Sequence, residues 1–136
     1  MSGLTVPGDL VDAMVAHARA ELPNEACGVL SGSLSEGRAL TFHPTRNAEA
    51  SALRYSVHPE DLVRVTFEID DAGSDLVAIF HSHTKSPPVP SATDRRLAFY
   101  PSAFYLLVTL SDPDAPAFRA WRLRDGDAIE VPLTIE

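Results

Sequence analysis

The sequence predicts an α/β fold in which a mixed central sheet is flanked by helices. Along its 136 residues, the periodic segments follow one another in the order helix, strands, helix, strand, helix, strands. The run at 75–80 is almost entirely apolar, which is typical of a central strand that is covered on both faces. A chain of this length is near the middle of the range for one domain with one core. We therefore predict a single domain that spans residues 1–136.

The first half of the chain combines a helix, several strands and a second helix. Apolar residues recur at steps of four from Leu10, and this stripe predicts a helix that Asp9 caps and that ends before Pro23. A second helix is expected to begin near Pro59, since proline suits the first helical position and acidic residues follow it. Short apolar or alternating segments predict strands at 26–32, 38–45 and 53–57.

The second half begins with the apolar strand at 75–80 and continues through a proline-rich loop. Three prolines within 85–90 remove three backbone donors, so this segment cannot form regular structure. The segments predicted after it are a short helix that begins at the start of 91–100, a buried strand at 103–110 and a hairpin at 117–135 that turns at Asp125-Gly126.

Charge and cysteine content restrict the partners and the compartment. The formal net charge of −8 argues against binding to nucleic acid or to an anionic membrane. Cys27 is the only cysteine, so an intramolecular disulfide is impossible, and we expect this residue to be a small part of the core. The first residues contain no signal region, and no stretch approaches the ~20 apolar residues that span a bilayer. These features predict a cytoplasmic protein.

Two histidines end the apolar strand with the spacing of metal ligands. His81 and His83 are two residues apart, so their side chains point to the same side of a strand. Asp94 follows in the first turn of the predicted short helix, and the proline-rich loop is long enough to bring it back over the strand end. Two imidazoles, one carboxylate and an open position for water make a catalytic zinc site.

Each part of this pattern also has a purely structural interpretation. Ser91 and Asp94 alone fit a capping box at the start of a helix. His81 and His83 alone fit hydrogen-bonded histidines at a strand end. The complete pattern is expected by chance in on the order of one in a few hundred chains, so we interpret it as a metal site. Ser91 is able to cap the helix while its hydroxyl faces that site.

A zinc-bound water also needs a base that takes its proton and returns it to the leaving group. Glu25 is a candidate because it directly precedes the apolar segment at 26–32. A glutamate at a strand start is more often a solvated residue. The residue pattern alone does not distinguish Glu25 from the other acids near strands, which are Glu49, Glu60 and Asp61.

These residues together resemble the signature of the JAMM (MPN+, Mov34/MPN/PAD-1) zinc metalloprotease family. That signature is a distant glutamate followed by H-[S/T]-H-x7-S-x2-D, and here it reads His81-Ser82-His83, seven residues, Ser91, two residues and Asp94. The upstream segment PNEACGVLSG resembles the glutamate strand of the family. The resemblance extends from the first predicted helix to the final strands.

The resemblance implies a cytidine-deaminase-like JAMM/MPN domain and a role for each residue of the signature. Zinc is expected to be held by His81, His83, Asp94 and a water. Glu25 is expected to act first as general base and then as acid. Ser91 is expected to stabilise the oxyanion, to which an added donor contributes a few kcal/mol.

Within the family, the segments LVDAMVAHARAELPNEACGVLSG and HSHT to PSATDRRLA are most similar to the actinobacterial Mec-type hydrolases. This similarity implies a zinc metallopeptidase that releases cysteine from the C-terminal Gly-Gly of a ubiquitin-like sulfur-carrier protein, in cysteine biosynthesis. A metal site at a strand exit beside a sheet edge would allow the extended tail to add by main-chain hydrogen bonds. Two glycines, which have no Cβ, would let the tail pass close to the zinc.

Three other functions stay open at this point. Some relatives are deconjugating isopeptidases that remove ubiquitin-like modifiers from lysine. Others resemble non-catalytic MPN scaffolds, although the intact ligand set argues against that function here. A zinc hydrolase for small molecules, such as a deaminase, usually needs thiolate ligands in a P-C-x-x-C arrangement, which a chain with one cysteine cannot supply.

Overall fold

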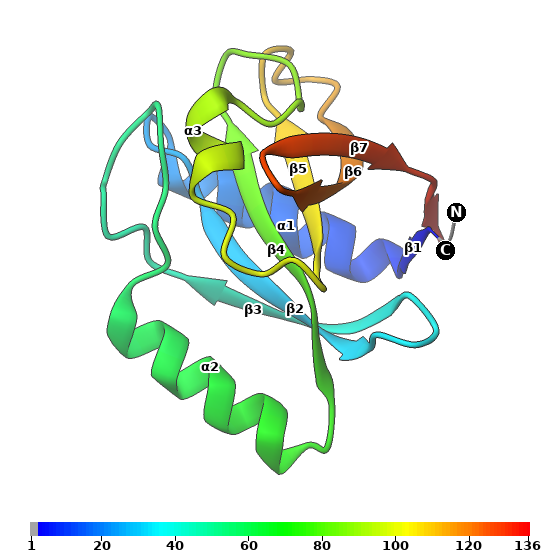
Figure 1. Cartoon of the computed structure of the whole chain (residues 1–136). Helices are drawn as coiled ribbons and strands as arrows, with labels where there is room; N and C mark the ends of the chain where they lie inside the picture. The colour runs from blue at the N-terminus through cyan, green and yellow to red at the C-terminus, as the bar shows by residue number, and fades with distance from the viewer. Residues whose placement is uncertain (1–2) are drawn as a thin grey trace.

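The computed structural model describes residues 3–136 and contains one mixed sheet with helices on both faces (Figure 1). The eight strands lie in the order β7-β6-β5-β4-β2-β3-β1-β8. Neighbours are antiparallel except for the pairs β1–β3, β1–β8 and β4–β5, which are parallel. The strands are β1 (Leu4–Val6), β2 (Cys27–Ser33), β3 (Arg38–Thr45), β4 (Asp75–His83), β5 (Phe104–Thr109), β6 (Ala117–Arg124), β7 (Asp127–Val131) and β8 (Leu133–Ile135). The helices of this described part are α1 (Gly8–Glu21), α2 (Pro59–Asp71) and α3 (Ala92–Arg96).

The sheet separates two hydrophobic cores, because successive residues of a strand point to opposite faces. Met14 of α1 packs on one face, in a core that contains Phe80 of β4. Val65 of α2 packs on the other face, in a core that contains Ile79 of the same strand. Figure 1 shows α1 behind the sheet, with α2 and α3 on the opposite side. The predicted α/β architecture is therefore confirmed.

β4 lies in the interior of the sheet, and its last residues are the predicted metal ligands. It pairs with β2 on one side and with β5 on the other. His81 and His83 follow Ile79 at steps of two, so they face the side of the sheet that α2 covers. The expectation that the site lies beside a sheet edge is wrong, because the edges are β7 and β8. A substrate tail cannot add to β4 as a further strand, since β2 and β5 already occupy both sides of it.

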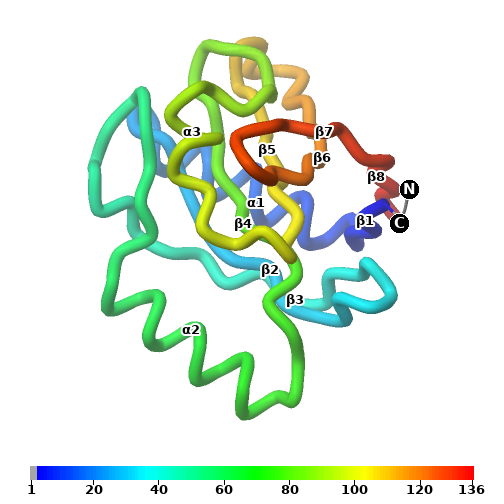
Figure 2. Tube along the Cα trace, in the orientation of Figure 1, coloured from blue at the N-terminus to red at the C-terminus, as the bar shows by residue number. Residues whose placement is uncertain are grey.

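The sequence prediction missed the parallel pair that joins the two ends of the chain. β1 and β8 have three residues each, and they lie side by side at one end of the sheet (Figure 2). The predicted hairpin at 117–135 turns at Asp125-Gly126 as expected, but it ends with β7. Pro132 separates β7 from β8, which then leaves the hairpin to pair with β1. Strands this short carry too little periodicity to be predicted.

Two local predictions in the first half of the chain are wrong. Asp9 does not cap α1, because the helix begins at Gly8 and the N-cap position is Pro7, without a side-chain hydrogen bond. The segment at 53–57 is not a strand, since its only ladder contact is an isolated bridge between Asn47 and Val57.

Other local predictions are confirmed. α1 ends before Pro23, and α2 begins at Pro59, where the side chain of His58 accepts a hydrogen bond from the Glu60 backbone. Cys27 is fully buried, and burial raises the pKa of its thiol to about 11. It is therefore an unreactive core residue, as expected. Of the helices that residues 3–136 form, none is long and apolar enough to cross a membrane.

Gly28 is expected to tolerate no side chain, because β2 and β3 are very close at this position. A Cβ added there would lie 2.6 Å from the Phe42 ring and 2.8 Å from the carbonyl oxygen of His43. We expect Gly28→Ala to lower the free energy of unfolding by ~1–3 kcal/mol, measured by denaturant titration. Gly8→Ala is the matched control, since its Cβ meets only the carbonyl of the terminal residue Glu136 at 3.1 Å. Equal stabilities for the two variants would contradict this explanation.

Candidate metal centre and active site

Three buried side chains bring one ligand atom each to a common point at the end of β4. His81 Nε2 and His83 Nε2 are 3.3 Å apart, and each lies 3.1 Å from Asp94 Oδ2. A zinc ion with tetrahedral bonds of about 2.0–2.1 Å would separate its ligand atoms by roughly 3.3–3.4 Å. The residues present therefore fit a single metal ion, as the spacing of the sequence predicts.

The protonation of the three ligands determines how a divalent cation binds. His83 Nδ1 donates to the carbonyl of Pro87, 2.7 Å away, so Nε2 is the nitrogen that His83 turns to the centre. Burial lowers the pKa of His81, which keeps that imidazole neutral. Burial opposes ionisation of Asp94, but hydrogen bonds from both histidines hold the pKa of its carboxyl well below the usual range. Burial opposes protonation of His83, but its hydrogen bonds with Asp94 and Pro87 raise the pKa of this imidazole. A divalent cation would therefore displace a proton from His83 Nε2 when it binds.

Asp94 is aimed at the histidines by the capping box that starts α3. Its backbone N–H donates to Ser91 Oγ at 3.0 Å, and its Oδ2 accepts from the Ser91 backbone at 2.9 Å. The predicted capping box is thus present. The same carboxylate oxygen that caps the helix also faces both imidazoles.

The proline-rich loop before α3 is held by its carbonyl groups. The carbonyls of residues 86–88 accept hydrogen bonds from Thr109 Oγ1 at 2.6 Å, His83 Nδ1 at 2.7 Å and Trp121 Nε1 at 3.0 Å, in that order. Prolines lack an N–H but keep this acceptor. Thr109 and Trp121, which the sequence did not indicate, therefore fix the path of the chain from β4 to Asp94.

Glu25 lies beside the metal ligands, and its carboxyl is buried. It lines a polar hollow of ≈330 Å³ together with His83, Ser91 and the segments 52–53 and 84–86. Only 4% of the residue is exposed, and its Oε1 has no hydrogen-bond partner among residues 3–136. Burial raises the pKa of this carboxyl to about 7, although the nearby His83 opposes the shift. A divalent cation bound next to it would favour the ionised form.

The other acids that the sequence left open have different surroundings. Glu60 and Asp61 both pair with Arg46, at 3.5 and 3.0 Å. Glu49 lines a different cavity, the apolar pocket described below. Of the four candidates, Glu25 is the one that shares the polar hollow with a metal ligand.

Asn47 organises the segment that covers Glu25. Its Nδ2 donates to the carbonyls of Glu25 at 3.0 Å and Arg54 at 3.1 Å. Its Oδ1 accepts from the backbone of Glu49 and of Ser56, both at 3.0 Å. Four hydrogen bonds from one side chain replace the ladder that a strand at 53–57 would have formed. Asparagine is common in loops, so the sequence alone does not predict this role of Asn47.

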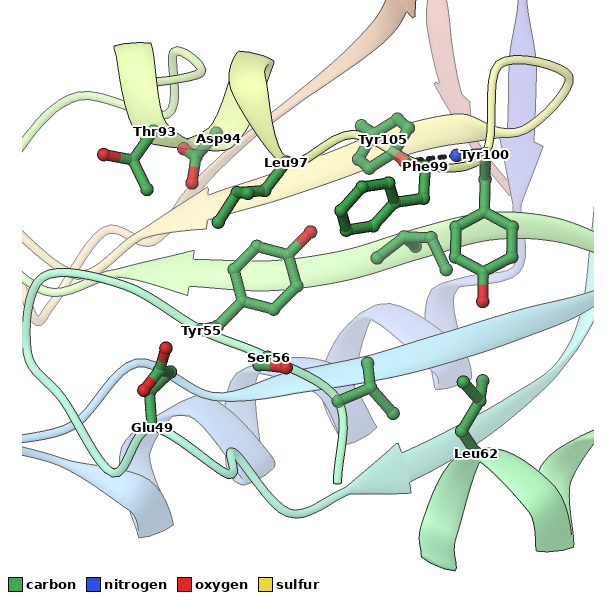
Figure 3. Close-up of a pocket in the computed structure, with 12 residues that line it drawn as sticks. Glu49, Tyr55, Ser56, Leu62, Thr93, Asp94, Leu97, Phe99, Tyr100 and Tyr105 are labelled. Atoms are coloured by element: carbon green, nitrogen blue, oxygen red, sulfur yellow. Dashed lines mark hydrogen bonds between the residues drawn. The ribbon is translucent and has the colours of Figure 1, made fainter. Parts of the chain in front are cut away.

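An apolar pocket of ≈200 Å³ lies against Asp94 (Figure 3). Tyr55 projects into it from one side and Leu97 from the other. The Tyr55 ring also stacks on His81, with 4.2 Å between the ring centroids, so the pocket and the metal ligands share a wall. The pocket is lined by Glu49, Tyr55, Ser56, Val57, Leu62, Ile79, Thr93, Asp94, Leu97, Phe99, Tyr100 and Tyr105.

Comparison with known families agrees with this geometry. The family described as prokaryotic homologs of the JAB domain matches residues 7–124, which include all three candidate ligands. The chain belongs to this family. The resemblance to JAMM proteins that the motif predicts is thereby confirmed.

Two curated relatives of this JAB-domain protein cover nearly its whole length. The CysO-cysteine peptidase of Mycobacterium tuberculosis is 41% identical over 132 residues, which are 97% of this chain and 90% of the relative. A probable TtuB-protein conjugate cleaving protease of Thermus thermophilus is 30% identical over 133 residues, which are 97% of this chain and 82% of the relative. The protein is therefore a homologue of JAMM metallopeptidases and carries their H-x-H and Asp ligand set.

Solved structures share the fold of this JAB-domain protein. A protein from Desulfitobacterium hafniense has a TM-score of 0.89 and 31% identity, covering 98% of this chain and 92% of that chain. A JAB1/MPN domain protein from Archaeoglobus fulgidus has a TM-score of 0.64 and 18% identity, with complete coverage of both chains. The predicted JAMM/MPN fold with a mixed sheet is confirmed.

Removal of one ligand is expected to release the metal. Protein purified without added metal should contain about one equivalent of a divalent ion by elemental analysis, because three ligands converge on one point. His83→Ala and Asp94→Ala should each lose most of it. Glu49→Ala is the control, since this acid lies near the site but outside the ligand triangle. Full retention in both ligand variants would contradict the assignment.

Proposed function

We propose that this protein is a zinc metallopeptidase that hydrolyses the bond between the C-terminal glycine of a ubiquitin-like sulfur-carrier protein and cysteine. The observation that carries the proposal is the buried triangle of His81, His83 and Asp94 next to the buried carboxyl of Glu25. The 41% identity to a protein named CysO-cysteine peptidase, over nearly the full length of both, supports this substrate. The single sheet with its two cores supports one domain over residues 1–136.

Zinc is the metal that suits this donor set. Two imidazoles and one carboxylate in a buried site are typical ligands of catalytic zinc, which keeps a further position for water. A zinc ion held there lowers the pKa of its bound water toward ~7 and polarises a carbonyl group. Such binding needs two neutral imidazoles and an ionised carboxylate, and it would displace the proton that the raised pKa of His83 favours.

Glu25 is proposed to move the proton. Hydrolysis forms a bond between the water oxygen and the glycine carbonyl carbon, and it breaks the bond from that carbon to the amine nitrogen. Glu25 accepts a proton from the attacking water and delivers it to the departing nitrogen. Its buried, unpaired Oε1 beside His83 supports this role.

Ser91 is proposed to stabilise the oxyanion. Its Oγ accepts the helix-capping hydrogen bond from Asp94, which uses a lone pair and leaves the hydroxyl hydrogen free to donate. Ser91 also lines the polar hollow with Glu25 and His83. A donor aimed at a developing oxyanion is worth about 3–4 kcal/mol of transition-state stabilisation in other hydrolases.

The carrier tail is proposed to lie across the strand ends rather than along the sheet. The edges of the sheet are remote from β4, but the apolar pocket opens beside Asp94 and can accept an apolar part of the tail. A substrate that carries a free cysteine thiol persists in a reducing compartment, so we place the reaction in the cytoplasm.

A second candidate is a general isopeptidase that removes ubiquitin-like modifiers from lysine. The similarity to the Thermus thermophilus protein, a probable TtuB-protein conjugate cleaving protease, supports it. Both candidates use the same metal ligands and the same base, so they differ only in the leaving group.

Glu25→Gln is expected to lose at least ~10²-fold in kcat while keeping the metal. The amide preserves the shape of the side chain but cannot carry a proton, and general acid–base catalysis contributes about 10²–10⁴-fold. Turnover is measured by intact mass of the carrier product, and metal content by elemental analysis. Glu60→Gln is the control at a solvent-exposed acid. A Glu25→Gln variant within a factor of ten of the unaltered enzyme would exclude Glu25 as the base.

The leaving group is tested with two adducts of one carrier protein. One carries cysteine on the C-terminal glycine, and the other is joined through that glycine to a lysine side chain. We expect faster release of cysteine, followed by intact mass, because a small leaving group suits the small polar hollow. Faster cleavage of the lysine adduct would favour the isopeptidase, and cleavage of neither by the metal-loaded protein would contradict both functions.

A further inference from the structure

Lys85 lies in the wall of the polar hollow that contains Glu25, His83 and Ser91. We propose that its ammonium group binds the α-carboxylate of the departing amino acid, and so selects a leaving group that is linked through its α-amine. This inference rests on the proposed peptidase function. It adds to that function a residue that determines which leaving group is accepted.

The polar hollow is on the leaving-group side of the metal ligands. The group that delivers a proton to the departing nitrogen must be within hydrogen-bond reach of it. Glu25 lines the polar hollow and does not line the apolar pocket. The departing residue therefore occupies the hollow, and the carrier tail lies toward Asp94 and the Tyr55 ring.

Lys85 is free to take a negatively charged ligand. It is the only lysine of the sequence, and it is exposed to solvent. The ion pairs formed within residues 3–136 do not include it. The protein has a formal net charge of −8, and Glu25 itself faces the same hollow. A carboxylate entering there would be repelled unless a cation compensates it.

The chemistry of the two possible leaving groups differs at this point. In an α-linked amino acid, the carboxylate is attached to the carbon that carries the scissile nitrogen. In a lysine isopeptide, the corresponding carbon is the end of an uncharged methylene chain. A cation in the wall of this hollow therefore favours the first leaving group electrostatically, and it offers nothing to the second.

The size of the hollow agrees with a single amino acid. Its ≈330 Å³ is near the lower end of the ~300–1,000 Å³ that ligand pockets occupy. Ala52 and Leu53 supply an apolar wall for a small side chain, and the Thr84 hydroxyl is 3.5 Å from the Ala52 carbonyl across the rim. The hollow thus offers a cation, a proton donor and an apolar surface to one residue.

The test compares carrier–cysteine that has a free carboxylate with the same adduct as its C-terminal amide. For the unaltered holoenzyme we expect about a tenfold higher kcat/KM for the free acid, mostly through KM, which corresponds to one charge-assisted contact. Lys85→Gln should reduce this ratio to about one, and Lys85→Arg should retain most of it. Arg19→Gln removes the same charge on α1, away from the hollow, and should keep the original ratio.

The outcomes separate this inference from the proposed function. Cleavage of both adducts at equal rates by the unaltered enzyme, or an undiminished ratio in Lys85→Gln, would overturn the role of Lys85 alone. A loss of the ratio in Arg19→Gln as well would assign the effect to net charge and would also overturn it. Cleavage of neither adduct by the zinc-loaded enzyme would remove the proposed function, and the role of Lys85 with it.

Discussion

One carboxylate oxygen, Asp94 Oδ2, connects the start of α3 with the end of β4. It accepts a hydrogen bond from the Ser91 backbone at the start of α3, and it lies 3.1 Å from each of the two imidazoles at the end of β4. α3 has only five residues, and isolated helices shorter than ~12–15 residues are marginal in water. The helix therefore depends on its capping box and on the loop before it, whose carbonyls at 86–88 are held from three strands. The ligand triangle results from these local constraints.

Burying polar atoms without hydrogen-bond partners in the site lowers the stability of the protein, and the rest of the fold must offset this loss. Among residues 3–136, the buried side-chain polar atoms without a hydrogen-bond partner are Glu25 Oε1 and His81 Nδ1. An unsatisfied buried polar group costs about 1–3 kcal/mol, and both of these lie in the active site. Two hydrophobic cores on opposite faces of the sheet stabilise the strands that carry them. Burial also reduces the screening of charge at the site, which strengthens every interaction with a bound cation.

The sequence predicts the features that short-range residue spacing determines. It does not predict the features that depend on side-chain hydrogen bonds in loops or on the order of the strands. His81, His83, Ser91 and Asp94 lie within fourteen residues, so a strand, a loop and a helix cap were enough to predict their convergence. Glu25 reaches them only through the pairing of β2 with β4, and its choice required the family resemblance. The predicted strand at 53–57 and the sheet-edge site were wrong, because loop hydrogen bonds and strand order are not encoded in local periodicity.

The segment between β3 and α2 contributes to both cavities, although it has almost no regular structure. Ala52 and Leu53 line the polar hollow, and residues 55–57 line the apolar pocket. Asn47 fixes this segment through four hydrogen bonds, one of which reaches the Glu25 carbonyl. None of these contacts involves the ligand triangle. Substitutions at 52–53 and 56–57 are therefore expected to change the surfaces offered to the leaving group and to the carrier tail, whereas Tyr55 also stacks on the metal ligand His81. The surfaces offered to the substrate thus come both from this segment and from the loop that carries the metal ligands, which supplies Lys85 and Ser91.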